Sequence, residues 1–486
     1  MVGISVGSPP YPFSTAENTE FTKESLIVRV PHIVTDIINL MHHQVISSNK
    51  IGSYKAVEEA KEIIAELSKI KYEMMTNKPI PNLQRDPAPD FDNWHSFITS
   101  NFENEVWLKT PFLWWETYLY RRIYGIFQRT EHWKDFDYFE SQKVNTFMQS
   151  KSAITKLAKR MSDVLQECLE SSGDNEVDNK KKLIGFIEVL QNSLWGNQTD
   201  LSMFPDLKTA DLEKMQAELV SGDKDHSIIT NESMNVWKAI NVVQSLKSKP
   251  QKTQNDIKAL TGSDSIAIVL DNSGFELFSD LLLAHWIIKM GYAKQIVFHA
   301  KSIPWYVSDV TPNDFKFVID ACASKETFAS SQNQSDKESI EQIENLNNLG
   351  KQWQEFVING TWKLQTNTFW NGPYSYNMLP NIETDLWEQL KQNYMIFYKG
   401  DLNYRKLISD LMWPADTPFS KASASMICKR QGSPVTVALR TSKAEVMVGV
   451  DKKTVEKLEE SVPNWRSIGK YGVIQTDLGR LKEYIE

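Results

Sequence analysis

The chain has 486 residues, of which 41% are hydrophobic and 24% are charged, and its net charge at pH 7 is −8. This length and balance are typical of a globular protein with more than one core, and they exclude wholesale disorder. The negative net charge argues against general nucleic-acid binding, although a protein with an acidic surface can still hold a basic pocket for a small anion.

Three further features concern the compartment. The cysteines, Cys168, Cys322 and Cys428, have neither metal-ligand spacing nor a disulfide framework, which fits a reducing environment. No apolar stretch approaches the ~20 residues that span a bilayer, and the N-terminal MVGISVGSPPYPFST lacks the features of a secretory signal. We therefore expect a cytoplasmic monomer that binds no membrane and no nucleic acid, while a nuclear location stays open.

The first 200 residues predict a helical region. Residues 1–20 are rich in Pro, Ser and Gly and predict a flexible N-terminal arm. Residues 21–200 predict a helical bundle domain, because their apolar residues recur at helical spacing and Gly is rare. Two roles remain open for Tyr118, Arg121 and Arg122 in this domain: they form a lid over a pocket, or they hold two domains together, which we favour.

The pattern changes at Ser265, where strand-like and helical runs begin to alternate. Such alternation predicts an α/β fold, with a mainly parallel sheet covered by helices on both faces. We assign this domain to residues 201–486. The expected strands are Ile266–Leu270, Gln295–Ala300, Tyr394–Tyr398, Val435–Leu439 and Ala444–Val450. Three helices are expected between them: one that follows the first strand and ends at Met290, one near Pro312–Ala323, and one over Asn403–Met412.

Polar residues follow four of these strands. Asp271 and Asn272 end the first, Asp309 follows the second, the segment Asp401–Arg405 follows the third, and Arg440 and Lys443 follow the fourth. Because the carboxyl ends of parallel strands meet at one edge of a sheet, we expect these side chains to lie close together.

This combination indicates a metal-assisted phosphoryl site. Asp271, Asn272 and Asp309 supply the oxygen ligands that Mg²⁺ or Mn²⁺ prefers. Lys443, with Arg405 or Arg440, supplies cations for a phosphate, and the helix that begins after Asp401 offers N–H groups to an anion. The nucleophile stays open between a metal-activated water and the Asp271 carboxylate.

Each motif alone also has a purely structural interpretation. The Asp-Asn-Ser-Gly sequence from Asp271 is typical of an ordinary turn, Asp309 and Asp401 of helix caps, and Arg440–Lys443 of a solvated strand end. The coincidence of all four at strand ends favours a functional site. No GxGxxG, GxxxxGK[ST] or GxSxG motif supports dinucleotide binding, a P-loop or a serine hydrolase.

Six segments resemble one family in sequence and order. They are WWETYLYRRI, LWGNQTDLS, DNSGFELFSDLLLA, HAKSIPWYVSDV, KGDLNYRKL and LRTSKAEV. This set resembles the metal-dependent damage-control phosphatases, specifically the sugar-phosphate subfamily III with its RTxK motif, whose animal members are also described as acidic-residue or protein-glutamate O-methyltransferases. The resemblance implies a helical N-terminal domain and a Rossmann-like α/β/α sandwich.

The resemblance also implies the site and its ligands. The metal ligands would be Asp271, Asn272 and Asp309, with Asp271 and Asp309 catalytic and Mn²⁺, Mg²⁺, Co²⁺ or Ni²⁺ as the metal. The substrates would be hexose phosphates, notably fructose 1-phosphate and also fructose 6-phosphate. The substrate contacts would be Asp271, Asn272, Asp401, Leu402, Asn403, Tyr404, Arg405, Arg440 and Lys443.

Two other functions remain as alternatives. An S-adenosylmethionine-dependent carboxyl methyltransferase would use Glu276 to contact its cofactor, but no Gly-rich cofactor loop follows the first strand. A sensor of sugar phosphates would bind without turnover. The acidic and basic clusters fit a metal and a phosphate better than a sulfonium cofactor, so the residues favour the phosphatase.

Overall fold

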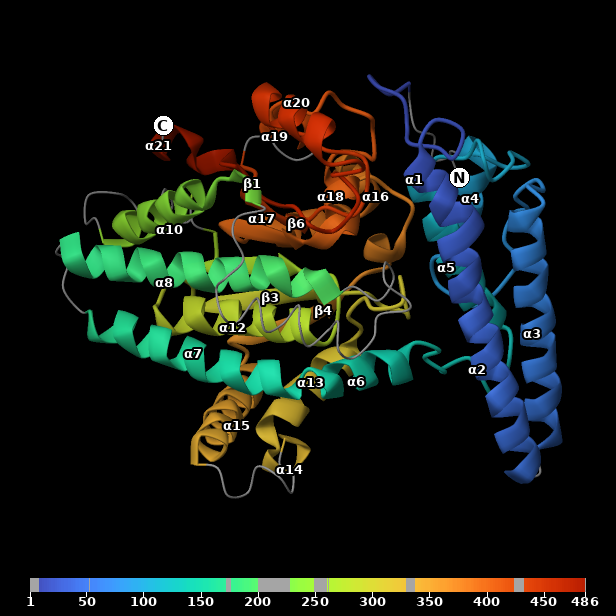
Figure 1. Ribbon diagram of the computed structural model, residues 1–486, viewed down its shortest axis with the longest axis horizontal. Coiled ribbons are helices and arrows are strands. Elements are labelled where there is room, and N and C mark those ends of the chain that lie inside the picture. The colour runs from blue at the N-terminus through green and yellow to red at the C-terminus, as the bar shows by residue number, and fades with distance from the viewer. Residues whose placement is uncertain are drawn as a thin grey trace.

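A seven-stranded sheet forms the centre of the molecule (Figure 1). The computed structural model describes residues 8–51, 53–171, 176–199, 228–248, 260, 262–328, 337–423 and 432–485. In spatial order the strands are β1-β7-β6-β5-β2-β3-β4, and every neighbouring pair is parallel except β6–β7. Their bounds are β1 (Ile228–Asn231), β2 (Ser265–Val269), β3 (Gln295–Ala300), β4 (Trp362–Thr366), β5 (Met395–Lys399), β6 (Val435–Thr441) and β7 (Gly472–Asp477).

The strand order creates a switch point between β2 and β5. From β2 the chain proceeds to β3 and β4 on one side, and then returns to place β5 and β6 on the other. Every residue of β2 and β5 is buried, which explains their continuous apolar sequences. In open α/β sheets the crevice outside such a switch point binds ligands, so the fold places Asp271 and Gly400 where a site is expected.

Helices cover both faces of the sheet, which confirms the predicted α/β fold. On one face, the core containing Ile266 and Ile268 packs against α6 (Glu140–Gln149), α7 (Lys151–Glu170), α8 (Glu176–Trp195), α10 (Ser233–Ser248), α12 (Phe275–Lys289), α13 (Pro312–Ala323), α14 (Lys325–Phe328) and α15 (Lys337–Ile358). On the other, the core containing Ala267 and Val269 includes α16 (Leu379–Ile382), α17 (Thr384–Lys391), α18 (Gly400–Leu407), α19 (Phe419–Ser423) and α20 (Lys452–Ser461).

The N-terminal helices stand together at one end of the molecule (Figure 1). They are α1 (Glu20–Glu24), the π-helix η1 (Ser25–Arg29), α2 (Val30–Ile51), α3 (Tyr54–Met75), α4 (Phe91–Asn101) and α5 (Phe112–Gln128). Short helical pieces elsewhere are η2 (Gly196–Thr199), η3 (Thr368–Asn371), η4 (Tyr376–Met378), η5 (Gly479–Leu481) and α21 (Lys482–Ile485). Among the described residues, no helix has the length and apolar character needed to cross a membrane.

Helices α6–α8 belong to the sheet rather than to the N-terminal helices. Their buried residues, such as Ile154 and Phe186, share a core with strands β2 and β3. The range 21–200 therefore does not form one separate bundle, because its second half buries its apolar face on the sheet. The boundary near residue 200 and the first seven residues lie outside the described part of the chain.

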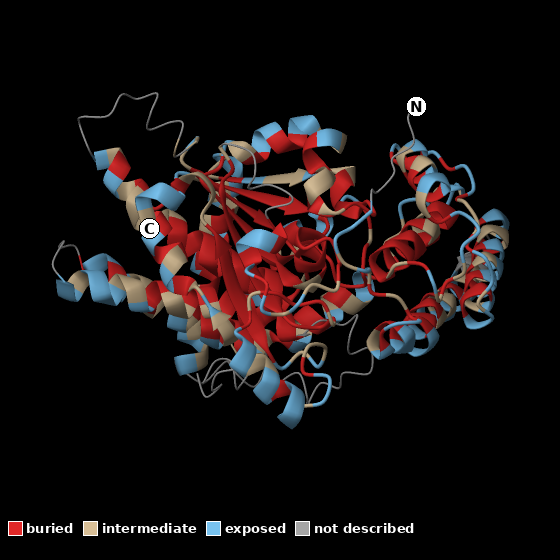
Figure 2. Cartoon of the chain, turned by 90° about the horizontal axis from the view of Figure 1, so that it is seen from above, coloured by how far each residue is buried: buried red, intermediate tan, exposed pale blue. Residues whose placement is uncertain are grey.

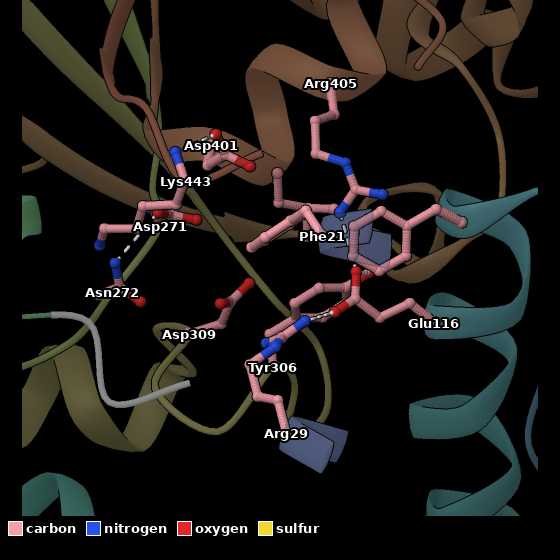
Figure 3. Close-up of a pocket in the computed structure, with 12 residues that line it drawn as sticks. Phe21, Arg29, Glu116, Asp271, Asn272, Tyr306, Asp309, Asp401, Arg405 and Lys443 are labelled. Atoms are coloured by element: carbon pink, nitrogen blue, oxygen red, sulfur yellow. Dashed lines mark hydrogen bonds and ion pairs between the residues drawn. The ribbon is translucent and has the colours of Figure 1, made fainter. Parts of the chain in front are cut away.

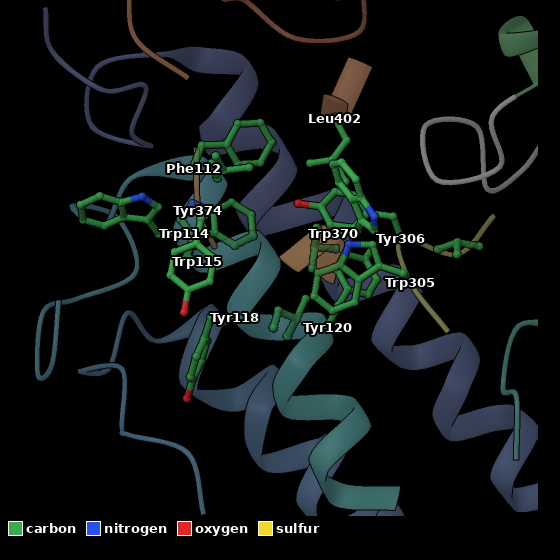
Figure 4. Packing of buried hydrophobic residues seen from close by; sticks show 14 of the residues in the cluster. Phe112, Trp114, Trp115, Tyr118, Tyr120, Trp305, Tyr306, Trp370, Tyr374 and Leu402 are labelled. Carbon is green, nitrogen blue, oxygen red and sulfur yellow. The ribbon is translucent and has the colours of Figure 1, made fainter. Parts of the chain in front are cut away.

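A continuous core joins the N-terminal helices to the sheet. One cluster of buried hydrophobic residues includes side chains of α2, α3 and α5 together with Ala267 and Val269 of β2, and Figure 2 shows buried residues in both parts. At the junction, aromatic rings from α5 meet rings from the α/β part (Figure 4), and Tyr120 stacks on Tyr306 with centroids 4.5 Å apart. Burial of this much aromatic surface fixes how α5 lies against the sheet edge.

Some local predictions differ from the structure. Ala444–Val450 is no strand; its buried carbonyl groups accept hydrogen bonds from side chains instead of pairing in the sheet. Strands β1, β4 and β7 were not predicted. The predicted helix Asn403–Met412 begins three residues earlier and ends at Leu407. The described part of the arm is fixed, since Ser14 is buried and its carbonyl accepts a hydrogen bond from the Phe112 N–H over 2.8 Å.

Candidate active site

A pocket opens at the carboxyl ends of β2 and β5, at the switch point of the sheet (Figure 3). Both parts of the molecule contribute to it. Its cavity has a volume of about 30 Å³, enough for about one water molecule. Its walls are formed by Phe21, Arg29, Phe112, Glu116, Asp271, Asn272, Tyr306, Asp309, Asp401, Leu402, Arg405 and Lys443.

The three predicted metal ligands lie together on one side of this pocket. A backbone bridge pairs Asn272 with Asp309, and the Val310 N–H donates to the Asp271 carbonyl over 2.8 Å. Asp271 and Asn272 are each 4% exposed and Asp309 is 2% exposed. Figure 3 shows the Asn272 amide with its nitrogen toward Asp271 and its oxygen toward Asp309.

Buried donors fix the side chains of Asp271 and Asp309 in place. Asn197 Nδ2 donates to Asp271 Oδ2 over 2.7 Å and to Glu276 Oε2 over 2.8 Å. Lys301 Nζ lies 3.2 Å from Asp309 Oδ2, which pairs that buried carboxylate with a cation. Neither Asn197 nor Lys301 was assigned a role from the sequence, although both stand in segments that carry the resemblance, LWGNQTDLS and HAKSIPWYVSDV.

Helix α18 presents part of the predicted substrate segment to the pocket. Asp401, Leu402 and Arg405 line the pocket, and Arg405 lies four residues after Asp401 and three after Leu402, the spacings at which helix positions are neighbours. Asn403 and Tyr404, also predicted as substrate contacts, are buried in the core and are not among the residues that line the pocket. Asn403 Nδ2 donates to the Leu270 and Lys399 carbonyls over 3.2 and 2.7 Å, which ties the ends of β2 and β5 together.

Of the two cations predicted to follow the fourth strand, Arg440 lies within β6, and the structure places only Lys443 in the pocket wall. Arg440 is a further correction: its side chain is fully buried and donates to Asp401 Oδ1 over 2.7 Å and to the Val446 and Ala444 carbonyls. Its guanidinium also lies 4.2 Å from the centre of the Tyr404 ring. Arg440 therefore positions Asp401 and the loop that carries Lys443, and it offers no donor to the pocket.

The N-terminal helices supply the opposite wall, which the sequence did not reveal. Arg29, Phe112 and Glu116 come from η1 and α5, and Tyr306 comes from the loop after β3. Arg405 donates to Glu116 Oε2 over 2.8 Å and makes two bonds to Asp410. Burial alone would lower the pKa of Arg405, but Asp410 and Glu116 raise it above its ordinary value.

Glu276, the candidate cofactor contact of a methyltransferase, is fully buried behind the pocket. Its carboxylate accepts hydrogen bonds from the amides of Asn197 and Asn272, and it lies 3.5 Å from Lys399 Nζ. Lys399 also lies 3.0 Å from Asp280, whose pKa burial raises to about 7. This position favours a structural role for Glu276 behind Asp271 rather than contact with a cofactor.

Tyr118, Arg121 and Arg122 neither line the pocket nor join the two parts. Arg121 pairs with Asp86 over 2.8 Å and with Asp90 over 3.0 Å. Tyr118 donates to the Pro81 carbonyl over 2.7 Å, and Arg122 pairs with Glu73. All three hold helix α3 and the Pro-rich connection after it onto α5, so both predicted roles are wrong.

The oxygen donors fit a hard divalent cation. Two carboxylates and one amide oxygen are the ligand types that Mg²⁺ and Mn²⁺ prefer, and Mg²⁺ takes waters and substrate oxygens for its remaining positions. Among the described residues, no three His, Cys, Asp or Glu side chains form a metal-binding group by themselves. The site therefore depends on the amide of Asn272 as its third protein donor.

The mainly parallel sheet with helices on both faces defines an α/β protein. Its acidic pocket lies at the switch point, where proteins of this class bind their ligands. Comparison with known proteins narrows the class. A sequence model of the damage-control phosphatase ARMT1-like domain matches residues 26–458. The chain belongs to this family of damage-control phosphatases.

Two relatives agree in sequence with this assignment over almost the whole chain. Damage-control phosphatase ARMT1 from Bos taurus is 31% identical over 484 residues, which cover 97% of this chain and 99% of the relative. The Homo sapiens protein of the same name is 31% identical over 464 residues, covering 92% and 94%. The crystal structure of a DUF89 family protein from Pyrococcus horikoshii aligns with 90% of this chain and 96% of its own, with a TM-score of 0.39 and 10% identity.

Proposed function

We propose that the chain is a metal-dependent phosphatase that hydrolyses hexose phosphates, notably fructose 1-phosphate and also fructose 6-phosphate, in metabolite damage control. One observation carries the proposal: Asp271, Asn272, Asp309 and Lys443 line one buried pocket at the switch point of the sheet. Hard oxygen donors beside an ammonium group suit a metal ion that shares a phosphate with a lysine.

Asp271, Asn272 and Asp309 would hold the metal, with Mn²⁺, Mg²⁺, Co²⁺ and Ni²⁺ as candidates. Four carboxylates and three cationic side chains line the pocket, so its formal charge is negative. A phosphate dianion would be repelled by such a pocket unless a divalent cation reversed the sign. When bound, the cation would polarise the phosphoryl oxygens as a Lewis acid.

The side chains then divide the remaining tasks. Lys443 and the start of α18 hold the phosphate, because an ammonium group and helix N–H groups both attract anions. Asp271 and Asp309 are the catalytic carboxylates. We favour water as the nucleophile, because two amide N–H groups already occupy Asp271 Oδ2, at 2.7 and 3.1 Å. Water attacks phosphorus, the ester P–O bond breaks, and the proton that the water gives up ends on the sugar oxygen that leaves.

Substrate entry requires the pocket to widen. A hexose phosphate is several times larger than the cavity of about 30 Å³. The wall formed by Phe21, Arg29, Phe112 and Glu116 belongs to the N-terminal helices, whereas the metal ligands belong to the sheet. We propose that these two walls separate to admit the substrate and close around it.

A screen of phosphate esters tests the proposal. The full chain, first stripped of metal with EDTA, is supplied with each of the four metals and with hexose and pentose phosphates, and released inorganic phosphate is measured. We expect turnover of fructose 1-phosphate with at least one metal and none with EDTA. Absence of phosphate release from every sugar phosphate under all four metals would contradict the proposal.

A further inference from the structure

Glu116 is a buried carboxylate in the pocket that the proposed hydrolysis does not require. It comes from α5, is 1% exposed, and lines the same cavity as Asp271 and Asp309. Figure 3 shows it on the other side of the pocket from these two carboxylates. Because Glu116 lies on the opposite side of the pocket from the proposed metal ligands, it is placed to contact another part of a bound molecule or to hold the pocket wall together.

Three donors from three different segments converge on Glu116. Arg29 donates to Oε1 over 2.5 Å, Arg405 donates to Oε2 over 2.8 Å, and the Tyr306 hydroxyl donates to Oε2 over 3.1 Å. All three side chains line the pocket. One buried carboxylate therefore sets the orientation of two guanidinium groups and a phenol toward the same cavity.

The donors are themselves held in place on their other sides. The Tyr306 ring stacks on Tyr120 with centroids 4.5 Å apart, and the backbone at Tyr306 has a positive φ of 44°. The Arg405 guanidinium lies 4.0 Å from the centre of the Phe112 ring and bonds to Asp410. Such a fixed group loses little conformational entropy when it binds a ligand, which is typical of a recognition site.

We propose that Glu116, with the donors that it aligns, determines specificity by hydrogen-bonding the hydroxyl groups of the sugar. This assignment rests on the proposed phosphatase function. The phosphate occupies the end of the pocket at Asp271 and Lys443, so the polyhydroxylated remainder of the molecule faces the other wall. Sugar hydroxyls both donate and accept, and the Glu116 group offers a carboxylate acceptor together with N–H and O–H donors.

A comparison of two substrates distinguishes a role of Glu116 in sugar recognition from a purely structural role. Fructose 1-phosphate carries the hydroxyl groups, whereas p-nitrophenyl phosphate carries none. In Glu116→Gln we expect kcat/KM for fructose 1-phosphate to fall by about tenfold to a hundredfold, the cost of a lost hydrogen bond to a charged group. For p-nitrophenyl phosphate we expect a change within about threefold, and inhibition by inorganic phosphate should stay unchanged.

Two further variants test whether a loss of activity in Glu116→Gln comes only from a general loss of stability. Tyr306→Phe removes only the hydroxyl group and should lower the same substrate ratio by a few-fold. Asp86→Asn is the matched control, because Asp86 is a buried carboxylate that pairs with Arg121 of the same helix as Glu116 but lies outside the pocket. We expect Asp86→Asn to lower the melting temperature without changing the substrate ratio.

The possible outcomes are distinct. A selective loss for fructose 1-phosphate in both pocket variants supports the assignment. Equal losses for both substrates, or no loss in either variant, would overturn it while leaving the phosphatase function intact. If the wild-type chain releases no phosphate from any ester, the proposed function fails, and the role of Glu116 fails with it.

Discussion

The position of the Asp271 carboxylate depends on the residues that donate hydrogen bonds to it. Asn197 donates to Asp271 Oδ2 over 2.7 Å, and its own backbone carbonyl accepts from the Lys443 ammonium group. Asn197 thus joins a proposed metal ligand to a proposed phosphate contact through one short residue. Its neighbour Gly196 permits this, since a Cβ there would lie 3.0 Å from the Glu276 Cα on α12.

Removal of the Asn197 side chain should weaken metal binding. Asn197→Ala deletes a donor that orients Asp271, and loss of such an outer partner typically costs about tenfold to a hundredfold in metal affinity. Calorimetric titration of the metal-stripped chain with Mn²⁺ measures this directly. Asn192→Ala is the control, because Asn192 is a buried residue of α8 that donates to Met161 Sδ over 3.6 Å. Equal Mn²⁺ affinities in both variants would contradict the positioning role.

The site residues differ in how far the sequence predicts them. Asp271, Asn272 and Asp309 each follow an apolar strand, so the meeting of strand ends at one sheet edge was enough to place them. Arg440 and Lys443 look alike as cations in the sequence. Only the structure separates them, because Arg440 still belongs to β6 and its donors are taken by Asp401 and by carbonyl groups.

At the scale of elements, helix α18 carries one wall of the pocket and begins at a constrained position. Gly400 has a φ of +79°, and a Cβ there would lie 1.7 Å from Asp271 Oδ2. Only glycine allows the helix to begin this close to the carboxylate. The strand-to-helix turn therefore fixes the distance between α18 and the metal ligands.

Gly400→Ala should inactivate the protein, whereas Gly360→Ala should not. Gly360 has the same φ of +79°, but a Cβ added there would have no other atom within 4 Å. Both variants carry the backbone strain of about 1 kcal/mol or more, and only Gly400→Ala displaces Asp271. Urea unfolding and phosphate release, measured on both variants, check this expectation. Full activity in Gly400→Ala would show that the close approach has no functional role.

The elements also show why some predictions failed. The segment Ala444–Val450 is as apolar as a buried strand, but its carbonyls accept from the side chains of Arg440 and Gln475. The sequence pattern cannot reveal that side chains, rather than a neighbouring strand, satisfy these carbonyl groups. Glu116 and Arg29 were missed for a related reason, since their place in the pocket depends on how the N-terminal helices pack against the sheet.

At the scale of the whole molecule, the core that α12 and α15 form on one face of the sheet surrounds a titratable group. His285 on α12 is 4% exposed, and its Nδ1 accepts from the Trp353 indole over 3.2 Å. Burial, with a smaller contribution from Lys289, lowers the pKa of His285 to about 3. Folding therefore requires a neutral imidazole at this position.

Stability should consequently fall in acid partly because of His285. In the unfolded chain the His285 imidazole is protonated below a pH of about 6.5, whereas in the folded chain it stays neutral down to about pH 3. The free energy of unfolding therefore decreases as the pH falls from about 6.5 to about 3. The slope is about 1.4 kcal/mol per pH unit. His285→Gln retains an acceptor for Trp353 but does not titrate. Urea unfolding at several pH values should show the wild-type advantage shrinking below pH 6.5, and parallel curves would contradict it.

The central claim is that Asp271, Asn272 and Asp309 hold a metal ion for the hydrolysis of a sugar phosphate. The most direct test measures inorganic phosphate released from fructose 1-phosphate by the wild-type chain and by Asp271→Asn, each with Mn²⁺ and with EDTA. We predict that the wild type releases phosphate with Mn²⁺ but not with EDTA. In Asp271→Asn we predict that the rate of release with Mn²⁺ falls by about a thousandfold or more. Release by the wild type that EDTA leaves undiminished, or wild-type rates in Asp271→Asn, would contradict the claim.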